Sequence, residues 1–142
     1  IFKALRVGGK NYAQSAAEHV DPENCHFAGM AWRVMRALDF LAKMPEWDGE
    51  SLRVSGGSQA GMQSLWAAAL DPRVTRADIA FPWCCDLGGS AKFGRNPKKW
   101  GVEWTDAMGY YDPVNLAKRI SCPVSISRAG LGVTSFTRRA KP

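Results

Sequence analysis

The sequence predicts an α/β fold, in which a mostly parallel sheet of three or four strands is flanked by helices. Three short runs predict strands, at residues 52–55, 76–83 and 122–127. A helix-forming segment, 62–70, lies between the first two runs, and an amphipathic segment precedes them. Two parallel strands joined by a helix form a right-handed crossover, so these elements belong to one layered unit.

Length and composition fit a single folded domain over residues 1–142. The chain has 142 residues, of which 46% are hydrophobic and 23% charged, so a soluble protein with a real core is expected. No apolar run approaches membrane-spanning length and no signal peptide is visible. The chain starts at Ile1 rather than Met, so we expect a shortened domain with an upstream segment missing.

The net charge of +6 raises the question of a nucleic-acid partner. The basic residues are scattered, and their two local groups, 95–99 and 138–141, lack the interleaved aromatic residues of single-strand binders. We therefore expect no nucleic acid. Four cysteines without C-x-x-C spacing or histidine partners argue against zinc, so no metal or cofactor is expected, and a reducing, cytoplasmic location fits best.

The first helix is predicted to begin at Asp21, as N-cap, with Pro22 in the first turn. It should end near Pro45. The polar face is expected to carry Arg33, Arg36, Asp39 and Lys43. Apolar residues recur at helical spacing on the other face: Phe27, Met30, Ala31, Val34, Leu38 and Leu41.

The central stretch, 52–69, has the order of a nucleophile elbow: a strand, two glycines, Ser58 and then a helix. Such a turn exposes the serine above the sheet and aims the backbone N–H of Gln59 at an oxyanion. The usual pattern is G-x-S-x-G, whereas here Ala60 stands in the last place and Gly61 follows one residue late. The alternative is a serine that only caps the following helix.

The remaining segments carry weaker patterns. Residues 1–20 form a poorly defined N-terminal segment, and residues 88–105 are glycine-rich, basic and aperiodic, as in a long loop or lid. A short helix should open at Asp112-Pro113 and run through Lys118. Residues 134–142 are expected to be a loose tail.

Five segments together resemble the acetyl xylan esterase and cephalosporin-C deacetylase family of α/β-hydrolases. The resemblance covers about residues 22–132 and implies a partial α/β-hydrolase fold that deacetylates small esters through Ser58, with Gln59 N–H in the oxyanion hole. The matching segments are Met35–Leu41 before Trp47-Asp48-Gly49, Ser55–Gln59, Ala67–Val74, Tyr110–Ala117 and Ile120–Val124.

The chain departs from the family where the acid and base are expected. The family aspartate position holds Val133, and no histidine follows residue 26. One interpretation is a shortened hydrolase, with an altered reading frame from Val133 onward. Another is a rebuilt triad of Ser58, Asp86 and His26, with His19 as a second candidate base. The rival hypothesis is a catalytically inactive fragment that serves as a binding or assembly module.

Two further expectations concern partners. The substrate is expected to be a small-molecule ester, and tryptophans 83, 100 and 104 are candidates either to line a sugar groove or to pack in the core and lid. Three or four strands would leave open sheet edges, so a homo-oligomer is expected.

Overall fold

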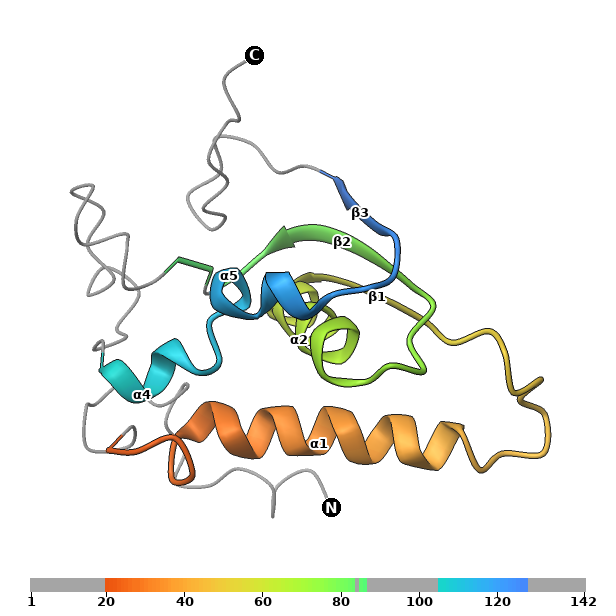
Figure 1. Cartoon of the computed structure of the whole chain (residues 1–142), viewed down its shortest axis with the longest axis horizontal. Coiled ribbons are helices and arrows are strands. Elements are labelled where there is room, and N and C mark those ends of the chain that lie inside the picture. Colours follow the sequence, from red (N-terminus) through yellow and green to blue (C-terminus); the bar gives the residue numbers. More distant parts are fainter. Residues whose placement is uncertain (1–19, 84, 87–104, 128–142) are drawn as a thin grey trace.

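The computed structural model describes residues 20–83, 85–86 and 105–127, drawn in colour in Figure 1. The predicted N-terminal segment, lid-like loop and tail lie outside the described residues, apart from Val20 and Thr105.

A three-stranded parallel sheet forms the centre of the described part of the chain. Its strands are β1 (Arg53–Ser58), β2 (Arg76–Pro82) and β3 (Val124–Ser127), in the order β1-β2-β3. Both pairings are parallel, and β2 is the central strand. The predicted fold class is therefore confirmed, with three strands rather than four among these residues.

The two long helices form two successive layers on the same side of the sheet. Helix α1 spans His26–Leu41, and α2, Gln59–Leu70, joins β1 to β2. Figure 1 shows α2 between α1 and the sheet, and α2 contacts both. Three short elements, α4 (Asp106–Gly109), α5 (Pro113–Leu116) and η3 (Ala117–Arg119), lead into β3.

Helix α2 is apolar on nearly every side because it is the middle layer. Met62 and Trp66 are fully buried between α1 and α4, while Leu65 and Ala68 face the sheet residues Ala77 and Ile79. The indole N–H of Trp66 donates to the carbonyl of Tyr111 at 2.6 Å. This bond leaves no unpaired polar atom on the buried ring.

The prediction that α1 begins at Asp21 is wrong. The helix begins at His26 with Cys25 at the N-cap. The Asp21 carboxylate instead closes a separate turn, accepting from the backbone N–H of Glu23 at 2.9 Å and of Asn24 at 2.8 Å. Aspartate bonds to nearby backbone groups as readily in an isolated turn as at a helix start, so the sequence pattern fits both.

The apolar face of α1 is confirmed except at its end. Phe27, Met30, Ala31 and Leu38 are buried, whereas Leu41 is 47% exposed. Helix α1 ends at Leu41, and the turn after it leads away from the core. The periodicity of the apolar residues predicted that the buried face extends to Leu41, about one turn beyond Leu38, the last buried residue of this helix.

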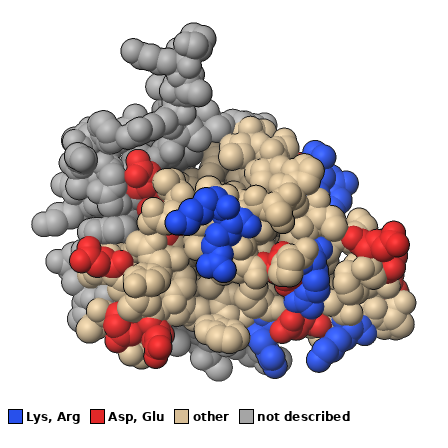
Figure 2. Space-filling model, viewed as in Figure 1, with Lys and Arg blue, Asp and Glu red and all other residues tan. Residues whose placement is uncertain are grey.

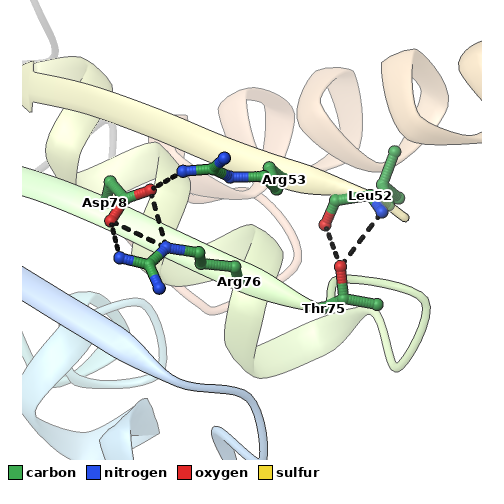
Figure 3. Close-up of polar contacts among 5 residues, drawn as sticks. All are labelled: Leu52, Arg53, Thr75, Arg76 and Asp78. Carbon is green, nitrogen blue, oxygen red and sulfur yellow. Dashed lines mark hydrogen bonds and ion pairs between the residues drawn. The ribbon is translucent and has the colours of Figure 1, made fainter.

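A polar network joins β1 to β2 at the strand ends remote from Ser58. Asp78 accepts from Arg53 and Arg76, each at 2.9 Å, and the Thr75 hydroxyl bonds the backbone of Leu52 (Figure 3). Hydrogen bonds from Arg76, and then from Arg53, lower the pKa of Asp78 to about 2. Figure 2 shows basic and acidic groups interspersed over the viewed face of the described residues.

Helix α1, with 16 residues, is the longest helix described, and no described helix is long and apolar enough to cross a bilayer.

Candidate active site

Ser58 occupies a strained bend at the end of β1. Its backbone has φ 55° and ψ −120°, a region that residues with a side chain seldom adopt, and α2 begins at the next residue. Strain of this kind costs on the order of 1–3 kcal/mol, persists only when the surroundings impose it, and clusters at functional sites. The predicted order of strand, sharp turn and helix is therefore present.

The bend is fixed against the end of β2. The backbone N–H of Trp83 donates to the carbonyl of Ser58 at 2.9 Å. The strand register places Gly57 opposite Ala80 and Ser58 opposite Pro82, so it skips Phe81, which has a positive φ of 32°. A bulge of this type bends one strand locally and re-aims the chain beside it.

The alternative that Ser58 merely caps α2 is not supported. Ser58 stands at the N-cap position, yet its side chain makes no capping hydrogen bond. The hydroxyl also makes no hydrogen bond to any other described residue, and Ser58 is only partly buried. Its oxygen is thus available to an incoming molecule.

Two glycines allow the close approach of strand and helix. A Cβ on Gly56 would lie 2.5 Å from the carbonyl carbon of Ala60, closer than real Cβ contacts come. A Cβ on Gly61 would lie 3.1 Å from Cα of Pro82 and 3.2 Å from the carbonyl oxygen of Ala80. The late glycine of the sequence pattern is therefore the residue that packs on β2, whereas Ala60 is exposed.

A cavity of about 390 Å³ opens between α1 and the first turn of α2. This volume is in the range of small-molecule sites. Helix α1 contributes its stripe of residues at helical spacing, and α2 contributes Gln59 and Gln63 one turn apart. The lining residues are His26, Met30, Arg33, Val34, Ala37, Gln59 and Gln63.

The cavity brings together two of the predicted site residues. Gln59 directly follows Ser58 and is the first residue of α2, so its backbone N–H lies at the positive end of that helix. His26 is the first residue of α1 and faces the same cavity from the other side. Ser58 directly precedes Gln59 in the chain and is not itself among the lining residues. No hydrogen bond joins Ser58 to His26.

Asp86 lies just beyond the end of β2, on the same edge of the sheet as Ser58. Its backbone has a positive φ of 60°, and its N–H donates to Oδ1 of Asp112 at 2.9 Å. Asp112 is only 5% exposed and also accepts from the backbone N–H of Val114 at 3.0 Å. One buried carboxylate thus holds the loop of Asp86 and the start of α5 together.

Sequence reasoning predicted Asp112 only as a helix start. Its Asp-Pro pair signals an N-cap, which the structure confirms, but the bond to Asp86 joins residues 26 positions apart. No local pattern carries that information.

Cys85, next to Asp86, is not suited to act as a nucleophile. Burial, assisted by the charges of Asp112 and Asp86, raises the pKa of its thiol to about 12. The thiolate is the reactive form of cysteine, so this thiol stays protonated and inert near neutral pH.

The other candidates are only partly described. Trp83 is half-buried and packs against the core cluster of α1 and α2. His19, Val133 and the tryptophans at 100 and 104 lie outside the described residues. Within the described ranges, no three histidine, cysteine or acidic side chains gather in a way that could hold a metal ion.

Comparison with known proteins adds independent observations. The family model for acetyl xylan esterase matches residues 17–132. The chain is also similar to acetyl esterase Axe7A of Xylanibacter ruminicola, with 39% identity over 115 residues. That match covers 75% of this chain and 26% of the relative, so the chain spans about a quarter of the relative's length.

Two solved structures are similar in fold. Acetyl xylan esterase from Paenibacillus sp. R4 matches with a TM-score of 0.63 and 27% identity, covering 75% of this chain and 38% of that one. Acetyl xylan esterase 1 from Thermoanaerobacterium sp. JW/SL YS485 matches with a TM-score of 0.68 and 25% identity, covering 85% and 44%.

Proposed function

The chain belongs to the acetyl xylan esterase family, and from this premise we propose that it is a serine esterase that hydrolyses short acyl esters, especially acetyl esters. Its fold is part of an α/β-hydrolase, as the sequence resemblance implied. The observation that most supports the proposal is the strained backbone of Ser58 directly before Gln59, a residue that lines a cavity together with His26.

In the proposed mechanism the Ser58 hydroxyl attacks the ester carbonyl carbon while His26 accepts its proton. A serine hydroxyl needs such a base because it is a weak nucleophile when protonated. The tetrahedral intermediate carries a negative oxygen, which the Gln59 N–H stabilises at the positive end of α2. His26 then returns the proton to the leaving alcohol, which leaves an acyl group on Ser58.

Water hydrolyses the acyl-enzyme by the same two steps, addition and then elimination, with water in place of the alcohol. His26 takes a proton from water as its oxygen attacks the acyl carbon, and His26 then returns that proton to Ser58 Oγ as the C–Oγ bond breaks and the carboxylic acid is released. Asp86 is proposed to orient the His26 ring, the part that a buried or loop carboxylate plays in hydrolytic triads. The hydrogen bond from the Asp86 backbone N–H to Asp112 fixes the backbone of that loop.

Hydrolysis of p-nitrophenyl acetate tests the proposal. The wild-type chain should release p-nitrophenol faster than buffer alone, and Ser58→Ala should lose that activity. The mechanism would be refuted by an activity that is unchanged in Ser58→Ala.

A catalytically inactive binding or assembly module is the second candidate function. It is favoured by the sequence, which has Val133 at the family aspartate position and no histidine after residue 26. It is also favoured by the missing hydrogen bond between Ser58 and His26. Catalytic hydrogen bonds are often long in a free enzyme and tighten only in the complex, so this geometry does not decide between the two.

We also propose that copies of the chain associate. Strand β3 is an edge strand among the described residues, and its apolar Ile126 is 49% exposed. Trp32 and Phe40 of α1 are exposed by 68% and 64%. Open edges and large exposed apolar side chains favour protein contacts. A reducing, cytoplasmic location remains a prediction from the sequence.

A further inference from the structure

The described residues that line the cavity next to Gln59 carry positive rather than negative charge. Among the described lining residues, the polar groups are one guanidinium, one imidazole and two carboxamides, and none of these residues is acidic. Its apolar groups, Met30, Val34 and Ala37, all come from α1. A neutral or negatively charged ligand would therefore meet no charge repulsion here.

Among the described residues of this lining, Arg33 is the one whose side chain always carries a full charge. The ion pairs among the described residues are made by Arg53, Arg73 and Arg76, and Arg33 makes none with a described residue. Its Nη1 lies 3.7 Å from the place a Cβ on Gly29 would occupy. The side chain thus folds back one turn toward the end of α1 that carries His26.

The number of positive charges in the cavity determines which kind of anion it binds best. A guanidinium binds carboxylate and phosphate in the same two-point geometry. In the proposed mechanism His26 is neutral when it accepts the serine proton, so among the described lining residues Arg33 then carries the one positive charge. One charge matches a carboxylate better than it matches a phosphate dianion.

We propose that this cavity binds the alcohol part of the ester and prefers alcohols that carry a carboxylate, which Arg33 holds. The inference rests on the proposed esterase function, because it names the substrate class of that same site. The apolar stripe of Met30, Val34 and Ala37 packs against the body of the alcohol, while Gln59 and Gln63 hydrogen-bond its polar groups. The acetyl group faces Ser58.

A matched pair of acetate esters tests this preference. 4-Acetoxybenzoate and its methyl ester present the same acetyl group on nearly the same phenol, and only the first carries a carboxylate. The wild-type chain should show the higher kcat/KM on 4-acetoxybenzoate, although the methyl ester has the better leaving group. The preference should shrink in 1 M salt, because the screening length then falls to about 3 Å.

Arg33→Gln should lower the ratio of kcat/KM for the charged ester to that for the neutral ester by about five- to tenfold, as expected for one charge-assisted hydrogen bond at a partly exposed site. Arg36→Gln is the matched control, since Arg36 is exposed on the same helix and does not line the cavity. Its ratio should equal that of the wild type. An Arg33→Gln ratio equal to the wild-type ratio would overturn the proposal.

A binding measurement separates this inference from the esterase proposal. Titration of Ser58→Ala with 4-hydroxybenzoate, followed by nuclear magnetic resonance, should shift the signals of the cavity residues. Adding Arg33→Gln should weaken that binding five- to tenfold, whereas adding Arg36→Gln should not. If 4-hydroxybenzoate binds but the wild-type chain hydrolyses no ester, the esterase function alone is refuted. If 4-hydroxybenzoate does not bind, the present inference is refuted.

Discussion

Ser58 is held in a backbone conformation that the chain around it imposes. The residue needs a strand on one side, a helix on the other and close packing between them, and Gly56 and Gly61 provide the space. The strain therefore depends on two glycines, and larger residues at those positions should disturb both folding and activity.

Gly56→Ala should destabilise the protein strongly. The new methyl group would fall 2.5 Å from a backbone carbon of α2, so strand or helix must move, at a cost of about 3 kcal/mol. Gly57→Ala is the matched control, because its Cβ would come no closer than 3.3 Å to the Phe81 ring and 3.5 Å to the carbonyl oxygen of Ala80. Urea unfolding of both variants measures the difference, and equal midpoints would contradict the account.

His26→Gln should reduce kcat on p-nitrophenyl acetate by about 100-fold or more, because a general base contributes at least that factor. Glutamine keeps the size and a polar end but does not take up a proton near neutral pH. Ser64→Ala, a substitution elsewhere in α2, serves as a control for general disturbance of the helix pair. A His26→Gln variant with wild-type kcat would remove His26 from the mechanism.

The sequence predicted the strand–turn–helix order around Ser58 better than it predicted the contacts that surround this turn. Ser58 and Gln59 belong to a local motif, so the few residues around them are enough to predict the turn. The contact of Gly61 with Pro82 and the bond of Asp86 to Asp112 join distant parts of the chain. Neither contact can be predicted from the spacing of residues along the sequence.

Helix α1 brings both His26 and Arg33 to the cavity, so its attachment to α2 controls the site. Near its C-terminal end, Asp39 accepts from Arg73 at 2.8 Å, and Arg73 is in turn bound by the buried Asp71. Near its N-terminal end, Phe27 packs edge-on against Trp66, with ring centroids 5.8 Å apart. The helix is thus fixed at both ends.

Asp71→Asn should lower stability at neutral pH by about 1–2 kcal/mol, since charge-assisted bonds to a partly exposed arginine are lost. Hydrogen bonds from Arg73 hold the pKa of Asp71 below its ordinary value, against the opposing effect of burial. The wild-type advantage is therefore present above about pH 4, the unfolded-state value, and is lost as the pH falls through the folded-state pKa.

Urea unfolding at pH 7 and at pH 3 measures that difference. Glu50→Gln, an exposed substitution outside the network, is the control and should change neither midpoint. A stability difference between wild type and Asp71→Asn that is as large at pH 3 as at pH 7 would contradict the role given to this carboxylate.

At the level of elements, periodicity predicted the helices but not all of their ends. The amphipathic spacing of α1 is that of a helix packed on one side, whereas the choice between Asp21 and Cys25 as its cap depends on which turn Asp21 closes. Strand β2 was predicted to within one residue because an apolar run between two turns permits few alternatives.

The described part of the molecule leaves large apolar side chains exposed on several elements, among them β3 and α1. The parallel order and the crossover followed from the sequence, because a helix between two strands restricts how they can pair. Which side chains stay exposed did not follow, since exposure depends on what covers each face.

We predict that the chain is a homo-oligomer at micromolar concentration, with a mass in size-exclusion chromatography and light scattering that is a multiple of 15.6 kDa. Ile126→Lys, which places a charge on the exposed strand, should shift the population toward the monomer. Val114→Lys is a matched control, because Val114 is similarly exposed but lies on α5. A strictly monomeric wild type would count against association.

The central claim is that Ser58 is an activated nucleophile, and covalent labelling tests it most directly. A fluorophosphonate probe reacts with activated serines, and intact-mass analysis counts the adducts. We predict one adduct per chain in the wild type, located at Ser58, and none in Ser58→Ala. A wild-type chain that stays unlabelled, or an adduct that persists in Ser58→Ala, would contradict the account.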